Sequence, residues 1–130
     1  MHFWFSLLGK HSRVAAYGYS KSLHLFKEYL KLYKVPANYA LNASGGGKFD
    51  ELMKDLKKED FYRGTFSSYQ LTNGSKKAID LTKEDKKEIR KSFKNKVFIC
   101  PGPCGDCTSI GHACGNLDTF KNVDIITPIH

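Results

Sequence analysis

The chain has 130 residues, 41% of them apolar and 13% aromatic, and it carries a formal net charge of +8 at pH 7. This length is enough for one modest hydrophobic core, so we expect a single domain that spans residues 1–130. The apolar stretch at residues 3–8 is far shorter than the ~20 residues of a membrane-spanning helix, and no signal-peptide features surround it. We therefore expect a soluble, cytoplasmic protein without membrane contacts, whose positive charge favours anionic partners but defines no site.

The first half of the sequence alternates between strand and helix patterns. An aromatic and small apolar run that stops at Ser20 predicts a buried strand. Apolar residues then recur every three or four positions from Leu23 to Tyr33, which predicts an amphipathic helix that ends before Pro36. A further apolar run leads into the glycine turn Gly45–Gly47. The predicted elements are a strand at 13–20, a helix at 23–33, a strand at 38–43 and a helix at 49–56.

The second half continues this alternation. An aromatic stretch followed by the turn residues Asn73 and Gly74 predicts a third strand. Thr82 is a suitable N-cap for the next helix, because Asp85 stands at the capping-box position and Ile89 begins its apolar stripe. The predicted elements are a strand at 61–69, a helix at 82–93, a strand at 97–99 that runs straight into the cysteines, and a last strand at 123–127.

Strands that alternate with helices at this spacing are typical of βαβ units, because a parallel return needs a crossover helix. The sequence therefore predicts an α/β fold, in which strand-helix units form a small, mostly parallel sheet or partial barrel with a C-terminal cysteine-rich loop. Functional groups in such folds gather where strands end, and here the strand ends carry polar residues and the cysteine loop. An open sheet also has unpaired edges, so we expect a homodimer or a covering protein partner.

All four cysteines, Cys100, Cys104, Cys107 and Cys114, lie in the loop 100–114, and the first 99 residues contain none. Because the four cysteines are close together in the sequence, they cannot link distant parts of the chain as disulfides would. In a reducing compartment, clustered cysteines are more often metal ligands than disulfides. The intervening prolines and glycines let a short loop curl so that several sulfurs converge. We expect one closed metal centre, either an iron–sulfur cluster or a structural zinc, since both accept four thiolates.

Other interpretations of the cysteines remain open. The first three have the C-x3-C-x2-C spacing that radical S-adenosylmethionine enzymes use to hold an open four-iron cluster, although Cys114 could fill the fourth position. Cys104 and Cys107 also form a CxxC pair, which could act as a redox dithiol, and all four could be ordinary free or paired cysteines. His112 lies inside the loop and could replace one thiolate.

Two further features suggest anion binding. The glycine turn with Ser44 and Lys48 resembles a phosphate cradle, although it lacks the Walker pattern and also fits a tight turn that passes close to a neighbouring segment. Residues 76–96 contain nine lysines or arginines and four acidic residues, which would suit contact with nucleic acid or simply an exposed helix surface.

Three groups of residues together resemble the second half of the phage gene-product-88-like proteins, a family of unknown activity. They are Tyr17-Gly18-Tyr19-Ser20-Lys21-Ser22, Leu41-Asn42-Ala43-Ser44-Gly45-Gly46, and the Cys-Pro cluster with a closing histidine. The resemblance implies a degenerate radical-SAM-like barrel with a distal cysteine cluster, and a further cluster in a first half that this chain does not contain. It also implies that Tyr19, Lys21, Asn42 and Ser44 are strand-end residues of a ligand-binding site, and that the protein acts in the host cell cytoplasm.

The sequence thus predicts a small phage-type α/β protein that binds iron–sulfur or zinc and whose strand-end residues bind a small ligand or a partner protein. One alternative is a basic zinc module that binds nucleic acid. A second alternative is a remnant radical-SAM-like or redox enzyme that a partner chain completes.

Overall fold

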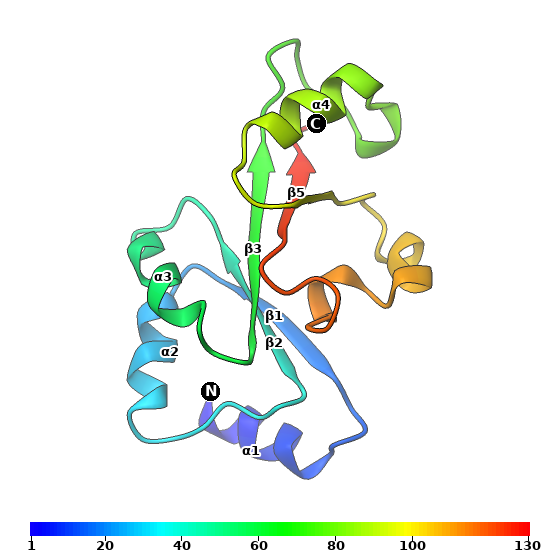
Figure 1. Ribbon diagram of the computed structural model, residues 1–130. Coiled ribbons are helices and arrows are strands. Elements are labelled where there is room, and N and C mark those ends of the chain that lie inside the picture. The colour runs from blue at the N-terminus through cyan, green and yellow to red at the C-terminus, as the bar shows by residue number, and fades with distance from the viewer.

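A computed structural model describes all residues from 1 to 130 and shows one open sheet of five parallel strands (Figure 1). The strand order is β1-β2-β3-β5-β4, and each neighbouring pair is parallel. β1 and β4 form the two edges, so the sheet does not close into a barrel. The strands are β1 (Ala16–Ser20), β2 (Tyr39–Ser44), β3 (Tyr62–Tyr69), β4 (Val97–Ile99) and β5 (Asp124–Pro128).

One α-helix precedes β1, and the other α-helices lie in the connections between β1 and β4. All four pack on one face of the sheet, which we call the helix face. The helices are α1 (His2–Lys10), α2 (Leu23–Leu30), α3 (Met53–Leu56) and α4 (Lys83–Lys91), and a 3₁₀ helix at Asp50–Leu52 leads into α3. α2 and α3 connect β1 to β2 and β2 to β3, as expected for parallel neighbours.

Two apolar clusters hold this face together. The larger one joins Leu41 and Tyr62 of the sheet to Phe5 of α1, Phe26 of α2 and Leu56 of α3. The smaller one joins α4 to the other end of the sheet, and its buried members are Leu71, Leu81, Ile89 and Ile126. Each fully buried aliphatic or aromatic side chain stabilises the fold by about 1.5–3 kcal/mol, so these clusters fix the helices on the sheet.

The predicted α/β class and the parallel sheet are confirmed. The predicted strand at 97–99 agrees with β4, and the helix expected from Thr82 is α4. The helix expected at 49–56 divides into a 3₁₀ turn and the four residues of α3, because Gly45–Gly47 and the turn after Leu56 leave room for little more. α1 was not predicted, although its apolar stretch was noted, because the run lacks an N-capping side chain.

A β-bulge between β2 and β3 decides which side chains reach the other face of the sheet. Leu41 lies opposite Tyr62, whereas the next residue, Asn42, lies opposite Gly64. Arg63 is therefore the extra residue of the bulge, and its side chain turns to the same face as Asn42. Gly64 makes this possible, because its φ is +146° and a Cβ there would lie 2.7 Å from the carbonyl oxygen of Val123.

The connection from β4 to β5 contains no α-helix and holds all four cysteines. It consists of the 3₁₀ helices Cys104–Ile110 and Ala113–Gly115 with irregular chain around them. The second of these contacts β1 and β2. In Figure 1 this orange segment lies on the side of β1–β3 opposite α2 and α3. We call the sheet surface that it covers the cysteine face.

Candidate functional site

The cysteine segment begins where β4 ends. The backbone amide of Cys100 donates to the carbonyl oxygen of Ile126 at 2.8 Å, which fixes the first cysteine to the inner strand β5. Three residues in left-handed conformations then fold the segment back on itself, and they are Gly102 (φ +102°), Gly111 (φ +72°) and His112 (φ +53°). The predicted tight curling of the loop is therefore present, and glycines make two of its three reversals.

The four thiols differ in exposure but influence one another electrostatically. Cys107 is buried, Cys100 and Cys114 are half-buried and Cys104 is exposed, and none forms a disulfide. Burial is the main reason why the pKa of Cys107 is raised, and the charges of Cys100, Cys114 and Cys104 raise it further. The pKa of Cys114 is also raised, first by burial and then by Cys100 and Cys104, while Tyr19 and Arg63 act in the opposite direction.

The thiols do not form a ready metal-binding geometry. No group of three or more His, Cys, Asp or Glu side chains lies close enough to hold a metal ion. The closed four-thiolate centre therefore stays a prediction, and the structure places its four candidate ligands near one another without joining them.

Two tyrosines of β1 lie beside the cysteines on the cysteine face. Tyr17 and Tyr19 pack edge to face with ring centroids 6.1 Å apart, and Tyr19 contacts Phe66 of β3 in the same way at 5.0 Å. Desolvation raises the pKa of both phenols, and charges on Cys104 and Cys114 raise it further. At neutral pH both tyrosines are therefore neutral, and the Tyr19 phenol lies beside Cys114.

The side chains of Asn42 and Arg63 connect the strands of the sheet to the cysteine segment. The Asn42 Nδ2 atom donates to the carbonyl oxygen of Cys114 at 2.8 Å and to that of Gly18 at 3.3 Å. Its Oδ1 atom accepts a hydrogen bond from Arg63 Nε. Both side chains are fully buried, so Asn42 serves here as a structural link between β1, β3 and the cysteine segment.

Sequence reasoning missed Arg63, although one pattern pointed to it. An arginine stands among the apolar residues that open the predicted third strand, directly before a glycine. A charged residue at such a position, beside a glycine that permits a bulge, is typical of a side chain that turns away from the apolar core.

The other predicted ligand-binding residues lie at the glycine turn. Lys21 follows β1, and a Cβ on Gly47 would lie 3.1 Å from the Lys21 Cβ, so the two loops are in contact. Ser44 is the last residue of β2. The predicted site thus divides into two pairs, with Tyr19 and Asn42 next to the cysteines and Lys21 and Ser44 at the turn.

The glycine turn does not offer free amides to an anion. The backbone amides of Gly46 and Gly47 both donate to the carboxylate of Asp50 at 2.9 Å. A Cβ on Gly45 would lie 2.4 Å from Ser67 Oγ, so this residue passes close to β3. These contacts support the tight-turn interpretation of the sequence over the phosphate cradle.

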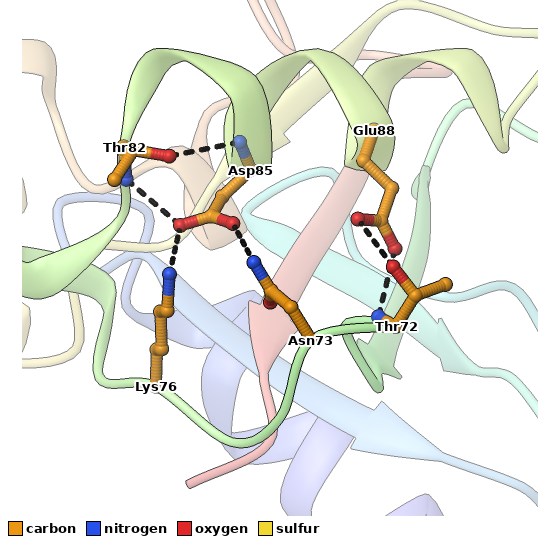
Figure 2. A network of polar contacts seen from close by, with 6 residues as sticks. All are labelled: Thr72, Asn73, Lys76, Thr82, Asp85 and Glu88. Atoms are coloured by element: carbon orange, nitrogen blue, oxygen red, sulfur yellow. Dashed lines mark hydrogen bonds and ion pairs between the residues drawn. The ribbon is translucent and has the colours of Figure 1, made fainter.

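The basic stretch at 76–96 is organised around a buried acid on α4 (Figure 2). The carboxylate of Asp85 accepts hydrogen bonds from Lys76 Nζ at 2.8 Å, from the Thr82 amide at 2.9 Å and from Asn73 Nδ2 at 3.1 Å. The Lys76 ammonium is the main cause of a strongly lowered pKa of Asp85. The predicted capping box between Thr82 and Asp85 is confirmed. Contact of this stretch with nucleic acid stays a prediction.

Fold and site together define a small α/β protein with an open parallel sheet and a segment with four free cysteines on the face that carries no α-helices. The family model described as "Gene product 88" matches residues 1–115, and the chain belongs to this family. The matched residues include all four cysteines as well as Tyr19, Lys21, Asn42 and Ser44, whereas β5 lies beyond them. Comparisons with curated proteins and with solved structures give no match.

The structure also bears on membrane contacts. None of its helices combines the length and the apolar character needed to cross a bilayer.

Proposed function

We propose that the gene product 88 chain is a metal-binding protein whose four cysteines hold one iron–sulfur cluster or one zinc ion on the cysteine face. The observation that carries this proposal is the set of four free thiols in one segment, in which Cys100 and Cys104 both raise the pKa of Cys107 and Cys114. Thiolates are soft ligands, and a set of four is typical of zinc and iron–sulfur sites.

The surroundings of the thiols suit such a centre. Cys107 is buried and Cys114 is half-buried, and burial raises the pKa of both thiols. A metal ion reverses that penalty, because it binds the thiolate and displaces the proton.

Binding requires the cysteine segment to rearrange, because no three of its possible ligands lie close enough together to hold a metal ion. The cysteines stand in and around two short 3₁₀ helices rather than a long regular element. Because ligands of small metal sites commonly assemble only when the metal binds, we expect metal loading to order this segment. The fixed ends of the movement are Cys100, held to β5, and Cys114, held to Asn42.

The test is the metal content and visible spectrum of protein produced with iron and zinc supplied and purified without oxygen. We expect one metal centre per chain. Brown protein with iron and sulfide would favour the iron–sulfur form and, with it, the radical-SAM-like character implied by the resemblance. Colourless protein with one zinc would favour a structural site.

Variants of the segment assign the ligands. Changing Cys107→Ser or Cys114→Ser should remove most of the bound metal, since each takes away one of four ligands. Ser109→Ala is the matched control, because Ser109 is an exposed residue of the same 3₁₀ helix and offers no thiol. Wild-type protein without metal under these conditions would contradict the proposal.

A protein partner is a separate proposal that the open sheet supports. β1 and β4 are unpaired edges, and α1 exposes Phe3, Trp4 and Leu7. We propose that a second chain covers these parts, and light scattering after size exclusion tests for a homodimer. A stable monomer of 14.7 kDa at micromolar concentration would contradict the homodimer.

A further inference from the structure

Arg63 is a fully buried cation without a carboxylate partner. Its relative exposure is 0%. The structure contains ion pairs at Lys27, Lys31 and Lys76, and none at Arg63. An arginine that is completely withdrawn from water normally has an anion beside it, because a buried charge that lacks compensation is costly.

Neutral oxygen atoms accept the hydrogen bonds of this guanidinium. Nε donates to Asn42 Oδ1, and the other donors reach backbone carbonyls. Those carbonyls are Phe120 O at 3.1 Å, Val123 O at 2.6 Å and Thr65 O at 2.6 Å. The acceptors hold the guanidinium in one orientation, but they do not neutralise it. Burial accordingly lowers the pKa of Arg63.

No carboxylate of the chain forms an ion pair with Arg63. Of the groups whose charge would oppose the lowering of the Arg63 pKa, Cys114 acts most strongly, followed by Tyr62 and Asp124, but the Cys114 thiol is neutral at physiological pH because burial raises its pKa. Tyr62 is neutral at physiological pH, since burial raises the pKa of its phenol to about 12. Asp124 accepts a hydrogen bond from Thr65 Oγ1 at 2.5 Å and forms no ion pair with the guanidinium.

Asn42 joins the two parts physically. Its amide oxygen accepts from Arg63, and its amide nitrogen donates to the Cys114 carbonyl. A change in the position or charge of the Cys114 end of the segment is therefore connected to Arg63 through a single side chain. The bulge at Arg63 and Gly64 turns this arginine toward the cysteine face.

We propose that Arg63 is the buried counter-cation of the metal–thiolate centre, and that Asn42 positions it by linking it to Cys114. This inference rests on the metal-binding function proposed above. A zinc ion with four thiolates carries a net charge of −2, so a fixed cation beneath it lowers the cost of burying the anion. Arg63 acts through its charge and through Asn42, and it does not ligate the metal.

The experiment measures zinc affinity by competition with a chelator, together with the rise in Tm that zinc produces. Residues that support metal ligands from outside typically change metal affinity by about 10- to 100-fold, and we expect that range for Arg63→Met. Arg63→Lys retains the charge and should recover much of the loss.

Asn42→Asp gives the decisive variant, because it leaves Arg63 in place and supplies it with a carboxylate. We expect this variant to fold, with its new ion pair, and to bind zinc about 10-fold or more weakly than the wild type. Asn42→Leu removes the amide without adding a charge and should weaken binding by a smaller factor. Should Arg63→Met not fold, the two Asn42 variants still decide the question.

The control is Lys27→Met, which removes one cation from α2 on the helix face, where Lys27 pairs with Asp55 at 2.6 Å. It changes the net charge as Arg63→Met does, and it should leave zinc affinity unchanged. The zinc-induced rise in Tm depends on affinity for the folded state, so a variant that merely destabilises the protein lowers Tm without reducing this rise.

Each result has one meaning. Unchanged zinc affinity in Arg63→Met and Asn42→Asp, with zinc bound by the wild type, would overturn the role of Arg63 and leave the metal-binding proposal standing. Equal losses in Arg63→Lys and Arg63→Met, with full affinity in Asn42→Asp, would show that shape and not charge matters and would also overturn it. A wild type that binds neither zinc nor iron would overturn both proposals.

Discussion

Each face of the sheet has a buried charged side chain, and the two side chains differ in whether an opposite charge pairs with them. On the helix face, Asp85 is almost fully buried, yet Lys76 pairs with it and Thr82 and Asn73 donate to it (Figure 2). On the cysteine face, Arg63 is equally buried, but its hydrogen-bond acceptors are all neutral.

This difference separates a structural network from one that points to a function. The Asp85 network is complete within about a dozen residues, and its purpose is to start α4 and hold the preceding turn. The Arg63 network brings together segments that lie far apart in the sequence and still lacks an anion. A buried charge without an ion-pair partner in the chain favours a ligand nearby, and we propose the metal centre as that ligand.

The largest effect on stability should follow from Arg63→Ala. The change leaves a cavity and removes the donor from Asn42 Oδ1 and from three carbonyl oxygens, so we expect a loss of about 3 kcal/mol or more in the free energy of unfolding. Urea denaturation of the metal-free protein measures it. A loss below about 1 kcal/mol would mean that water replaces the guanidinium, and the contrast between the two faces would not hold.

Gly64→Ala should destabilise the protein by about 2 kcal/mol, because the φ of +146° disfavours a side chain and the new Cβ would meet Val123 O at 2.7 Å. The matched control is Gly105→Ala in the cysteine segment, where a Cβ would have no atom within 4 Å. We expect the control to change stability by less than about 0.5 kcal/mol in the same denaturation experiment. Similar values for both variants would show that the bulge tolerates a side chain.

Asp85→Asn should lower stability in a pH-dependent way. Lys76, together with the Thr82 amide and Asn73, holds the pKa of Asp85 below its value in the unfolded chain, which is about 3.9. The stability that this carboxylate contributes is therefore fully present well above about pH 4 and is lost as the pH falls below it. Unfolding of wild type and variant from about pH 3 to 7 should show a constant difference above about pH 5 that shrinks toward pH 3. A difference that stays the same at all pH values would argue against the ion pair.

Thr82→Ala should have the smallest effect, a loss of about 1 kcal/mol, because it removes only the side-chain half of the capping box. Thr108→Ala is the control, since Thr108 is an exposed threonine inside a 3₁₀ helix. Thermal unfolding measures both. A loss as large as that of Asp85→Asn would mean that the cap, and not the buried carboxylate, organises α4.

Local patterns were sufficient to predict most of the elements. Apolar residues three and four positions apart predicted α2, and the Thr82–Asp85 pair predicted the start of α4. Both patterns involve residues within one or two helical turns of each other, so they can be recognised in the sequence. The order of the strands was not predictable in this way. β5 pairs with β3 and β4 through contacts between distant parts of the chain, and no local pattern specifies such pairing.

The sequence predicted the possible metal ligands of the candidate site but not the residues that lie beneath them. Four clustered cysteines identify possible metal ligands from composition alone, but Arg63 becomes part of the site through the register shift between Leu41 and Asn42. A one-residue shift reverses the face of every following side chain, so the bulge decides which side chains reach the cysteine face without leaving a clear pattern in the sequence.

The position of β5 has a consequence for the order in which the protein assembles. β5 is the last strand in the chain and yet lies between β3 and β4, and it is the only partner of β4. During synthesis, β1, β2 and β3 can therefore pair early and offer a surface to residues 113–115, whereas β4 and the backbone amide of Cys100 find their partners only when residues 124–128 have left the ribosome. Until then Cys100 lacks its hydrogen bond to β5, so we expect the proposed metal centre to assemble only after the last strand has paired.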